Sequence, residues 1–205
     1  MRKFPSPYRK EFEIFKKLDT PVKIQDFLDA IRINFEVKRE TCRSPLMVLR
    51  HKEAHCMEGA MLAAAVFWYH GEKPLLLDLK ANSNDDDHVV ALFRQGNLWG
   101  AISKTNHAVL QYRDPIYKTV RELALSYFNE YFLESGEKTL RSYSVPFDLS
   151  GYPGDWLASR QNLWHVAVDL DTSPHVALLK NGAARRLRKA NALEIKASTL
   201  AQWKK

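Results

Sequence analysis

The stretch Ala-His-Cys-Met-Glu-Gly-Ala-Met-Leu-Ala-Ala-Ala-Val-Phe-Trp-Tyr, residues 54–69, decides the fold. After Cys56 its only charged residue is Glu58, so a helix formed by this stretch is apolar on nearly every side. Such a helix must be buried on nearly every side. Gly59 and the alanines allow neighbouring elements to approach closely, and residues 70–71, His-Gly, provide a C-cap. The sequence therefore predicts a central buried helix that carries Cys56 in its first turn.

A second helix is predicted upstream of the central one. Thr20 followed by Pro21 is typical of an N-cap and a first helical position. Apolar residues then recur at helical spacing and form one face of a helix over residues 21–36: Ile24, Phe27, Leu28, Ile31 and Phe35. The preceding residues 1–20 are basic and contain prolines, so we expect an N-terminal arm or a short helix there.

Short strand-like runs follow the central helix, and a further helix follows them. Strands are predicted at residues 75–79, 88–94, 98–102 and 108–112, with a hairpin turn at Gln95-Gly96-Asn97. Asp114-Pro115 predicts the start of a helix that ends near residues 135–136. Its apolar face would contain Ile116, Val120, Leu123, Ala124, Tyr127 and Tyr131. Consecutive strands joined by tight turns favour an antiparallel sheet, so the predicted fold class is α+β.

The signals are weaker beyond residue 136. Residues 164–170 alternate like a strand, and residues 175–179 are predicted as its partner. We therefore divide the chain into a basic N-terminal arm (1–20), a core (21–135) and a C-terminal extension (136–205). Whether the extension packs on the core is left open.

The composition indicates a globular protein. Hydrophobic residues make up 45% and charged residues 27% of the 205 residues, which excludes wholesale disorder. Two cysteines are too few for a disulfide scaffold, and we expect Cys42 to be structural. No run reaches the roughly 18 apolar residues of a membrane helix, and no apolar segment follows the basic N-terminus as in a signal peptide. We therefore expect a soluble cytoplasmic protein without a membrane partner.

The net charge of +7 favours acidic partners but identifies none. A basic cluster lies near the C-terminus and contains Arg185, Arg186, Arg188 and Lys189. No nucleic-acid-binding motif accompanies it, so we interpret it as a solvated face and do not expect a nucleic-acid partner. The sequence does not indicate an oligomeric state.

Cys56 is the candidate nucleophile. A cysteine is nucleophilic as its thiolate, which the unpaired N–H groups and the dipole of a helix N-terminus favour. A histidine is needed to form the ion pair and to move the proton, and a third group must orient that histidine. His88 is the candidate partner because it opens a predicted strand directly after a polar loop.

The hairpin arithmetic nominates the third residue. If Gln95 and Gly96 form a two-residue turn, His88 lies opposite Ser103, within cross-strand reach. A three-residue turn would instead place Lys104 opposite His88, and Asn106 is close enough to be a substitute.

These residues resemble a known family. A cysteine that opens a buried Ala-rich helix, a histidine that opens a strand and a hairpin with a Trp-x-x-x-polar segment are similar to the transglutaminase-like branch of the papain-like fold. The matching segments are His-Cys-Met-Glu-Gly-Ala at 55–60, Asp-His-Val-Val at 87–90 and Trp-Gly-Ala-Ile-Ser at 99–103. The resemblance covers residues 20–134. It implies a core in which the cysteine-bearing helix packs on an antiparallel sheet.

The resemblance also implies an activity. Cys56 would attack an amide carbonyl and form a thioester, with His88 as the base and a protein or peptide as the substrate. Hydrolysis would make the protein a peptidase or amidase, and transfer to an amine would make it a transglutaminase-like acyltransferase. No cofactor is expected.

The sequence departs from the family at two positions. Ser103 stands where the family usually has Asp, and serine accepts a hydrogen bond from imidazole without adding negative charge. Arg50 stands six residues before the cysteine, where papain-like enzymes often carry the glutamine of the oxyanion hole, so only the backbone N–H of Cys56 is identified as a donor. The first departure favours an alternative, a non-catalytic module that binds a peptide or protein in the same cleft.

Each candidate residue also has a purely structural interpretation. Cys56 could be a packed hydrophobe, His88 a hydrogen-bonded strand-end residue and Ser103 an ordinary strand residue. The aspartates at 85–87 are typical of a solvated turn, and their functional alternative is a mobile lid or a negative field beside His88.

A zinc site is the least favoured alternative. His51 and His55 would lie on one face if the segment were helical, and Glu53, Cys56 and His88 could complete a ligand set. The spacing fits neither zinc-protease motif, so we expect no metal.

Overall fold

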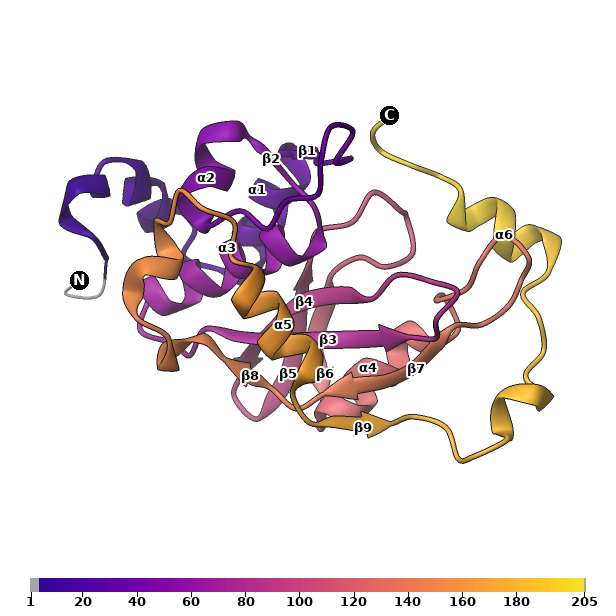
Figure 1. The fold of residues 1–205 in the computed structure, drawn as a ribbon. Coiled ribbons are helices and arrows are strands. Elements are labelled where there is room, and N and C mark those ends of the chain that lie inside the picture. Colours follow the sequence, from indigo (N-terminus) through magenta and orange to yellow (C-terminus); the bar gives the residue numbers. More distant parts are fainter. Residues whose placement is uncertain (1–3, 205) are drawn as a thin grey trace.

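A computed structural model describes residues 4–204, and it is a mixed α/β structure with an antiparallel sheet packed between helices (Figure 1). Six strands follow the order β6-β5-β4-β3-β7-β9, and β8 also pairs with β3. The strands of this sheet are β3 (Leu75–Ala81), β4 (His88–Gln95), β5 (Leu98–Ser103), β6 (Arg113–Tyr117), β7 (Leu140–Ser144), β8 (Phe147–Asp148) and β9 (His175–Ala177). A separate parallel pair consists of β1 (Arg32–Ile33) and β2 (Glu53–Ala54). The predicted α+β class with an antiparallel sheet is confirmed at this level.

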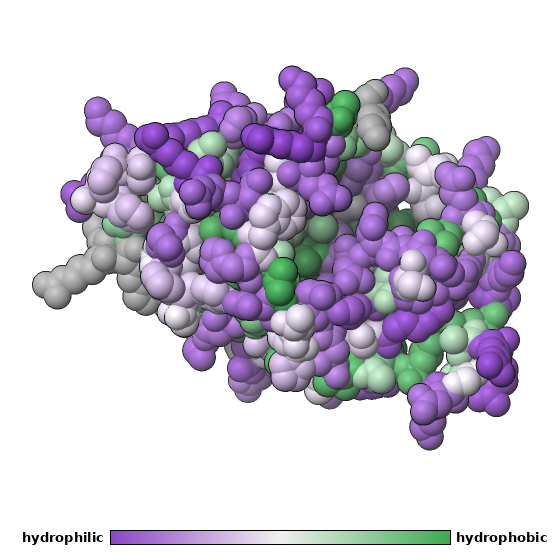
Figure 2. All heavy atoms as spheres, viewed as in Figure 1, coloured by the Kyte–Doolittle hydropathy of each residue, from purple (hydrophilic) through white to green (hydrophobic). Residues whose placement is uncertain are grey.

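Six α-helices occur in the described part of the chain. They are α1 (Pro21–Ala30), α2 (Pro45–His51), α3 (Cys56–Tyr69), α4 (Val120–Phe128), α5 (Trp164–Thr172) and α6 (Ala192–Ser198). Figure 1 shows α1, α2 and α3 grouped at one end of the sheet, with α4 behind its strands and α5 in front. The face seen in Figure 2 is covered mainly by hydrophilic residues. No helix among residues 4–204 is long and apolar enough to span a membrane.

Helix α3 is buried along nearly its whole length, as its composition predicts. It begins at Cys56, and all residues from 57 to 68 are buried. His70 is the C-cap, and Gly71 follows with φ +93°, a conformation that favours glycine. A Cβ atom on Gly59 would collide with the side chain of Lys104, so the close approach of these two segments requires glycine.

Strand alternation separates two cores on the two faces of the sheet. On one face Val89, Ala91 and Phe93 of β4 belong to the core formed with α3. On the other face Val90 and Leu92 belong to a second core formed with α4. Both faces of β4 are therefore covered, which explains its nearly continuous apolar sequence.

The β4–β5 hairpin turns at Gly96-Asn97, one residue later than predicted. Gln95 pairs with Leu98, so Val90, and not His88, lies opposite Ser103. Gly96 has φ +59°, which a two-residue hairpin turn requires and which glycine adopts without strain. The predicted pairing is wrong by two residues, but a shift of two keeps every side chain on the same face.

Helix α1 is shorter than predicted. It ends at Ala30, and Ile31 has extended backbone, so residues 31–36 are not helical. The carbonyls of Leu28 and Ile31 accept hydrogen bonds from the buried ammonium of Lys104. The chain then enters β1, which pairs with β2 immediately before α3.

The segment after β5 also differs from the prediction. Residues 108–112 are irregular, and Asp114 and Pro115 lie within β6. Helix α4 begins after Thr119, whose side chain and that of Glu122 form a capping box, and it ends at Phe128. The capping box satisfies two backbone donors, the N–H of Glu122 and the N–H of Thr119. It is therefore a stronger signal for the start of a helix than Asp-Pro.

The C-terminal segment supplies part of the same sheet. Residues 164–170 are helical rather than extended, and β9 pairs with β7 instead of with them. Strands β7 and β8 both pair with β3, the strand next to β4. At the other end of the chain, the segment predicted as an N-terminal arm contributes Phe12 and Phe15 to the core around α3. Residues 1–3 of that segment lie outside the described residues.

Candidate active site

Cys56 is the first residue of α3. The β1–β2 pair ends at Ala54, and His55 is the N-cap, so the thiol lies where the helix presents unpaired N–H groups. The residue as a whole is half-buried. Its position at the positive end of a long buried helix favours the thiolate.

His88 and Ser103 are in direct contact. The Nε2 atom of His88 lies 2.8 Å from the Oγ atom of Ser103, and both residues are buried. The Ser103 hydroxyl donates to the carbonyl of Leu110 at 2.5 Å, so its oxygen is left to accept a hydrogen bond from His88. This arrangement places the imidazole proton on Nε2 and leaves Nδ1 for the thiol of Cys56.

Gln25 of α1 holds Ser103 in place. Its side-chain amide donates to the carbonyl of Ser103 at 2.8 Å and accepts from the Ser103 N–H at 3.0 Å. The amide also donates to Asp29 at 2.8 Å, which fixes its orientation. Helix α1 thus anchors the end of β5 that carries the hydroxyl.

His55 is a second histidine at the thiol. Its Nε2 atom donates to the carbonyl of Thr41 at 2.9 Å and lies 3.5 Å from the carboxylate of Glu58. Burial would lower the pKa of His55, but the hydrogen bond and the charge of the Cys56 thiolate, together with the charge of Glu58, raise it to about 9.

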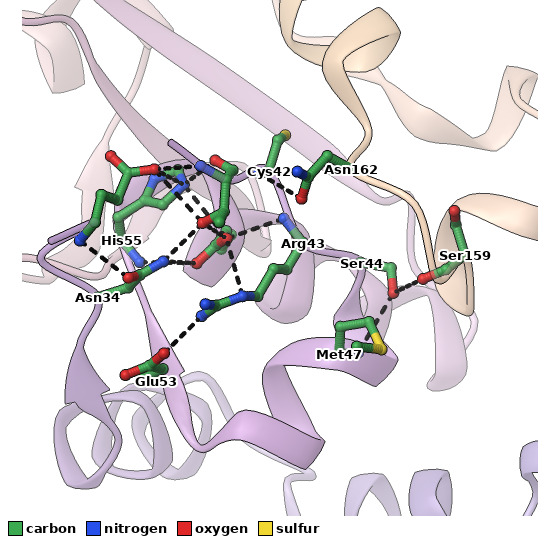
Figure 3. A network of polar contacts seen from close by, with 12 residues as sticks. Asn34, Cys42, Arg43, Ser44, Met47, Glu53, His55, Ser159 and Asn162 are labelled. Carbon is green, nitrogen blue, oxygen red and sulfur yellow. Dashed lines mark hydrogen bonds and ion pairs between the residues drawn. The ribbon is translucent and has the colours of Figure 1, made fainter. Parts of the chain in front are cut away.

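Four donors converge on the buried carboxylate of Glu58. The hydroxyl of Thr41 (2.7 Å) and the N–H of Arg43 (2.9 Å) bind one oxygen. The amide of Asn34 and the N–H of His55, both at 3.2 Å, bind the other. Figure 3 shows how Asn34, Arg43 and His55 enter this network from three different segments. Both oxygens of the carboxylate therefore act as acceptors, and the group is held in a fixed position behind His55.

The two histidines decide the protonation of Cys56. Burial alone would raise the pKa of the thiol, but hydrogen bonds with His55 and His88 and the charges of both imidazoles outweigh burial. The pKa of Cys56 consequently lies well below its ordinary value. Cys42 is the internal contrast, because burial and then the charge of Glu58 raise its pKa to about 12.

The structure brings together Cys56, His88 and Ser103 and separates the other candidates from them. Lys104 is buried against the end of α1, and Asn106 exchanges hydrogen bonds with the backbone of Trp203. Arg50 binds Glu11 at 2.6 Å, so its guanidinium is engaged away from the site.

The residues of the zinc alternative do not form one site. Helix α2 ends at His51 and Lys52 is left-handed, so His51 and His55 do not share a helix face. Glu53 binds Arg43 at 3.0 Å. In the described residues, these side chains do not form a group whose ligand atoms could reach one ion together.

The sequence-based reasoning missed three residues at the site. Glu58 and His55 had a signal, because a polar N-cap followed three residues later by Glu is the pattern of a capping box. Gln25 had none, since its contact with Ser103 joins residues 78 positions apart.

No model of a protein family matches the chain, and a search of curated proteins finds no match.

Proposed function

We propose that this protein is a cysteine-dependent enzyme that transfers acyl groups from amide bonds, with Cys56 as the nucleophile. The observation that carries the proposal is the meeting of one thiol at a helix N-terminus with two imidazoles, each held by its Nε2 atom. A cysteine that serves only for packing needs neither imidazole. The resemblance to the transglutaminase-like fold agrees with this chemistry.

The reaction would proceed through a thioester. The Cys56 thiolate attacks the amide carbon, and the N–H groups at the start of α3 stabilise the negative oxygen that forms. The imidazolium of His88 gives its Nδ1 proton to the leaving amine as the carbon–nitrogen bond breaks. Neutral His88 then removes a proton from water or from an acceptor amine, which attacks the thioester and releases the thiolate.

Ser103 and His55 have different parts in this proposal. Ser103 keeps the His88 ring in the tautomer that has a free Nδ1, as a neutral orienting group. His55, with Glu58 behind it, holds positive charge beside the thiolate. The carboxylate that is absent at Ser103 is thus present behind the other histidine, as Glu58, and the thiolate does not depend on His88 alone.

The first test measures the pH dependence of alkylation of each cysteine by mass spectrometry. Cys56 should react with an apparent pKa well below the reference value of about 8.5, while Cys42 stays unreactive in the folded protein. His88→Ala and His55→Ala should each raise the apparent pKa of Cys56. His51→Ala is the matched control, because His51 is exposed and has no part in the site. An ordinary or undetectable reactivity of Cys56 in the native protein would refute the nucleophile assignment.

The second test looks for the acyl-enzyme. Wild-type protein incubated with a mixture of peptide amides should gain an acyl mass on Cys56, and hydroxylamine should release it as a hydroxamate. Cys56→Ala should abolish this release without loss of the fold. His88→Ala should slow both acylation and deacylation, because His88 transfers a proton in each, while His51→Ala should leave both steps unchanged.

Ser103, which is neutral where an aspartate is usual in the resembling family, favours one alternative. In this alternative the protein is a non-catalytic module that binds a peptide or protein at the same place. It predicts saturable peptide binding that survives Cys56→Ala, together with no acyl-enzyme on any peptide tested. A reactive thiol that nevertheless forms no acyl-enzyme would favour this alternative.

A further inference from the structure

Three carboxylates meet at a second place, away from the thiol. Asp78 lies on β3, Asp87 directly precedes β4, and Asp171 lies in the last turn of α5. One ligand oxygen from each residue lies within 4.8 Å of the others. Asp78 and Asp87 lie at the two ends of one strand connection, and Asp171 joins them from a segment more than 80 residues later, so the fold assembles the cluster.

Asp78 is the unusual member of the cluster. It is 2% exposed, and its Oδ1 atom has no hydrogen-bond partner in the described structure. Its Oδ2 atom faces the Nε2 atom of His175 at 3.1 Å. A buried carboxylate oxygen without a donor costs free energy, so it calls for a physical explanation.

The charges around Asp78 do not supply a donor for Oδ1. Asp87 accepts from the N–H of Ala81 at 2.7 Å, and the ammonium of Lys80 binds Asp171 at the exposed side of the cluster. Burial, and then the charge of Asp87, raise the pKa of Asp78 to about 6. Three acidic groups thus share one lysine and one histidine.

The spacing suits a hard cation. Oxygen ligands lie about 2.0–2.1 Å from Mg²⁺ and about 2.3–2.6 Å from Ca²⁺. Two oxygens on opposite sides of a Ca²⁺ ion are therefore about 4.8 Å apart. Since 4.8 Å is the upper limit of the three separations, small side-chain rotations would bring all three oxygens into contact with one ion, and water can complete its coordination.

We propose that Asp78, Asp87 and Asp171 bind one hard divalent cation, with the Oδ1 atom of Asp78 as its buried ligand. The ion belongs to the class of Mg²⁺, Mn²⁺ and Ca²⁺, because the donors are carboxylates and the neighbouring imidazole nitrogen, Nε2 of His175, already faces Asp78. This site is distinct from the zinc alternative at residues 51–55. It does not depend on the proposed enzymatic function.

Lys80 gives the proposal a specific consequence. Its ammonium occupies an oxygen of Asp171 and competes with an ion for the negative charge. Lys80→Met keeps the aliphatic stem and removes the charge, so it should tighten cation binding. If Lys80 were instead the natural counter-ion of the cluster, the same change would only destabilise the protein.

The test is a titration of the full chain with Mn²⁺, followed by the electron paramagnetic resonance signal of the free ion. The protein is first treated with a chelator, and the buffer is kept at about pH 7.5, above the pKa of Asp78. We expect one saturable site per chain. Asp171→Asn should weaken binding about tenfold or more, and Lys80→Met should strengthen it. Competition by Mg²⁺ and Ca²⁺ then ranks the natural candidates.

The matched control is Asp86→Asn. It removes one negative charge, as Asp171→Asn does, but from an exposed residue that adjoins Asp87 and lies outside the cluster. It should bind Mn²⁺ like the wild type. Equal weakening in Asp86→Asn and Asp171→Asn would show diffuse attraction and overturn the proposal, as would the absence of saturation at several millimolar Mn²⁺. Asp171 is exposed, so its variant tests the site even if Asp78→Asn fails to fold.

Discussion

Glu58→Gln tests whether the buried carboxylate organises the site. Each oxygen of Glu58 accepts two hydrogen bonds, and all four donors are fixed by other segments. Glutamine keeps one oxygen but replaces the other by an NH₂ group, which then faces two donors. Two hydrogen bonds to a charged group are lost, each worth about 1.5–3 kcal/mol. We therefore expect the free energy of unfolding to fall by about 3–6 kcal/mol.

That loss is large for a domain of this size, whose stability is on the order of 5–15 kcal/mol. It is measured by urea denaturation, with an unchanged m-value required for the comparison. Glu53→Gln is the control, because Glu53 also binds Arg43 but is partly exposed and makes fewer contacts. It should cost no more than about 1 kcal/mol. A similar small loss for Glu58→Gln would refute the reasoning that the carboxylate is the centre of the network.

Two further changes test the packing beside the site. Gly59→Ala should destabilise the protein by about 1–3 kcal/mol, because the new Cβ meets the side chain of Lys104, whereas Gly151→Ala has open space and should be nearly neutral in thermal melts. Lys104→Met tests a pH effect on stability. Burial lowers the pKa of Lys104 from its ordinary value of 10.5 to about 8 in the folded protein. Between these two values the unfolded chain therefore binds more protons than the folded chain. The unfolding free energy of the wild type should consequently rise with pH across this window relative to Lys104→Met, and urea melts at both ends that show a constant difference would contradict it.

The central helix could be predicted because its sequence allows only one solution. A segment with a single charge after Cys56 has no face for water, so it must lie inside the protein. The pairing of His88 with Ser103 was derived from the wrong hairpin turn, yet the two side chains do meet. The reason is that sheet geometry repeats every two residues, and the error was a shift of two.

Other elements could not be predicted because their signals were local and short. Residues 164–170 contain valines at alternate positions, which fit a strand. In the structure Val166 and Leu170, four residues apart, pack into the α3 core while Val168 is exposed, which is the spacing of a helix face. The early end of α1 depends on Lys104, whose ammonium binds the last carbonyls from a distance of 73 to 76 residues. Contacts of that separation leave no trace in a local pattern.

The position of negative charge distinguishes the two histidines at the thiol. The residue that orients His88 is the neutral Ser103, whereas the carboxylate of Glu58 lies behind His55. The charge of the Cys56 thiolate, together with that of Glu58, raises the pKa of His55 against the effect of burial, so positive charge is stabilised on this ring. The arrangement therefore supports a division of labour in which His55 stabilises the thiolate and His88 transfers the proton.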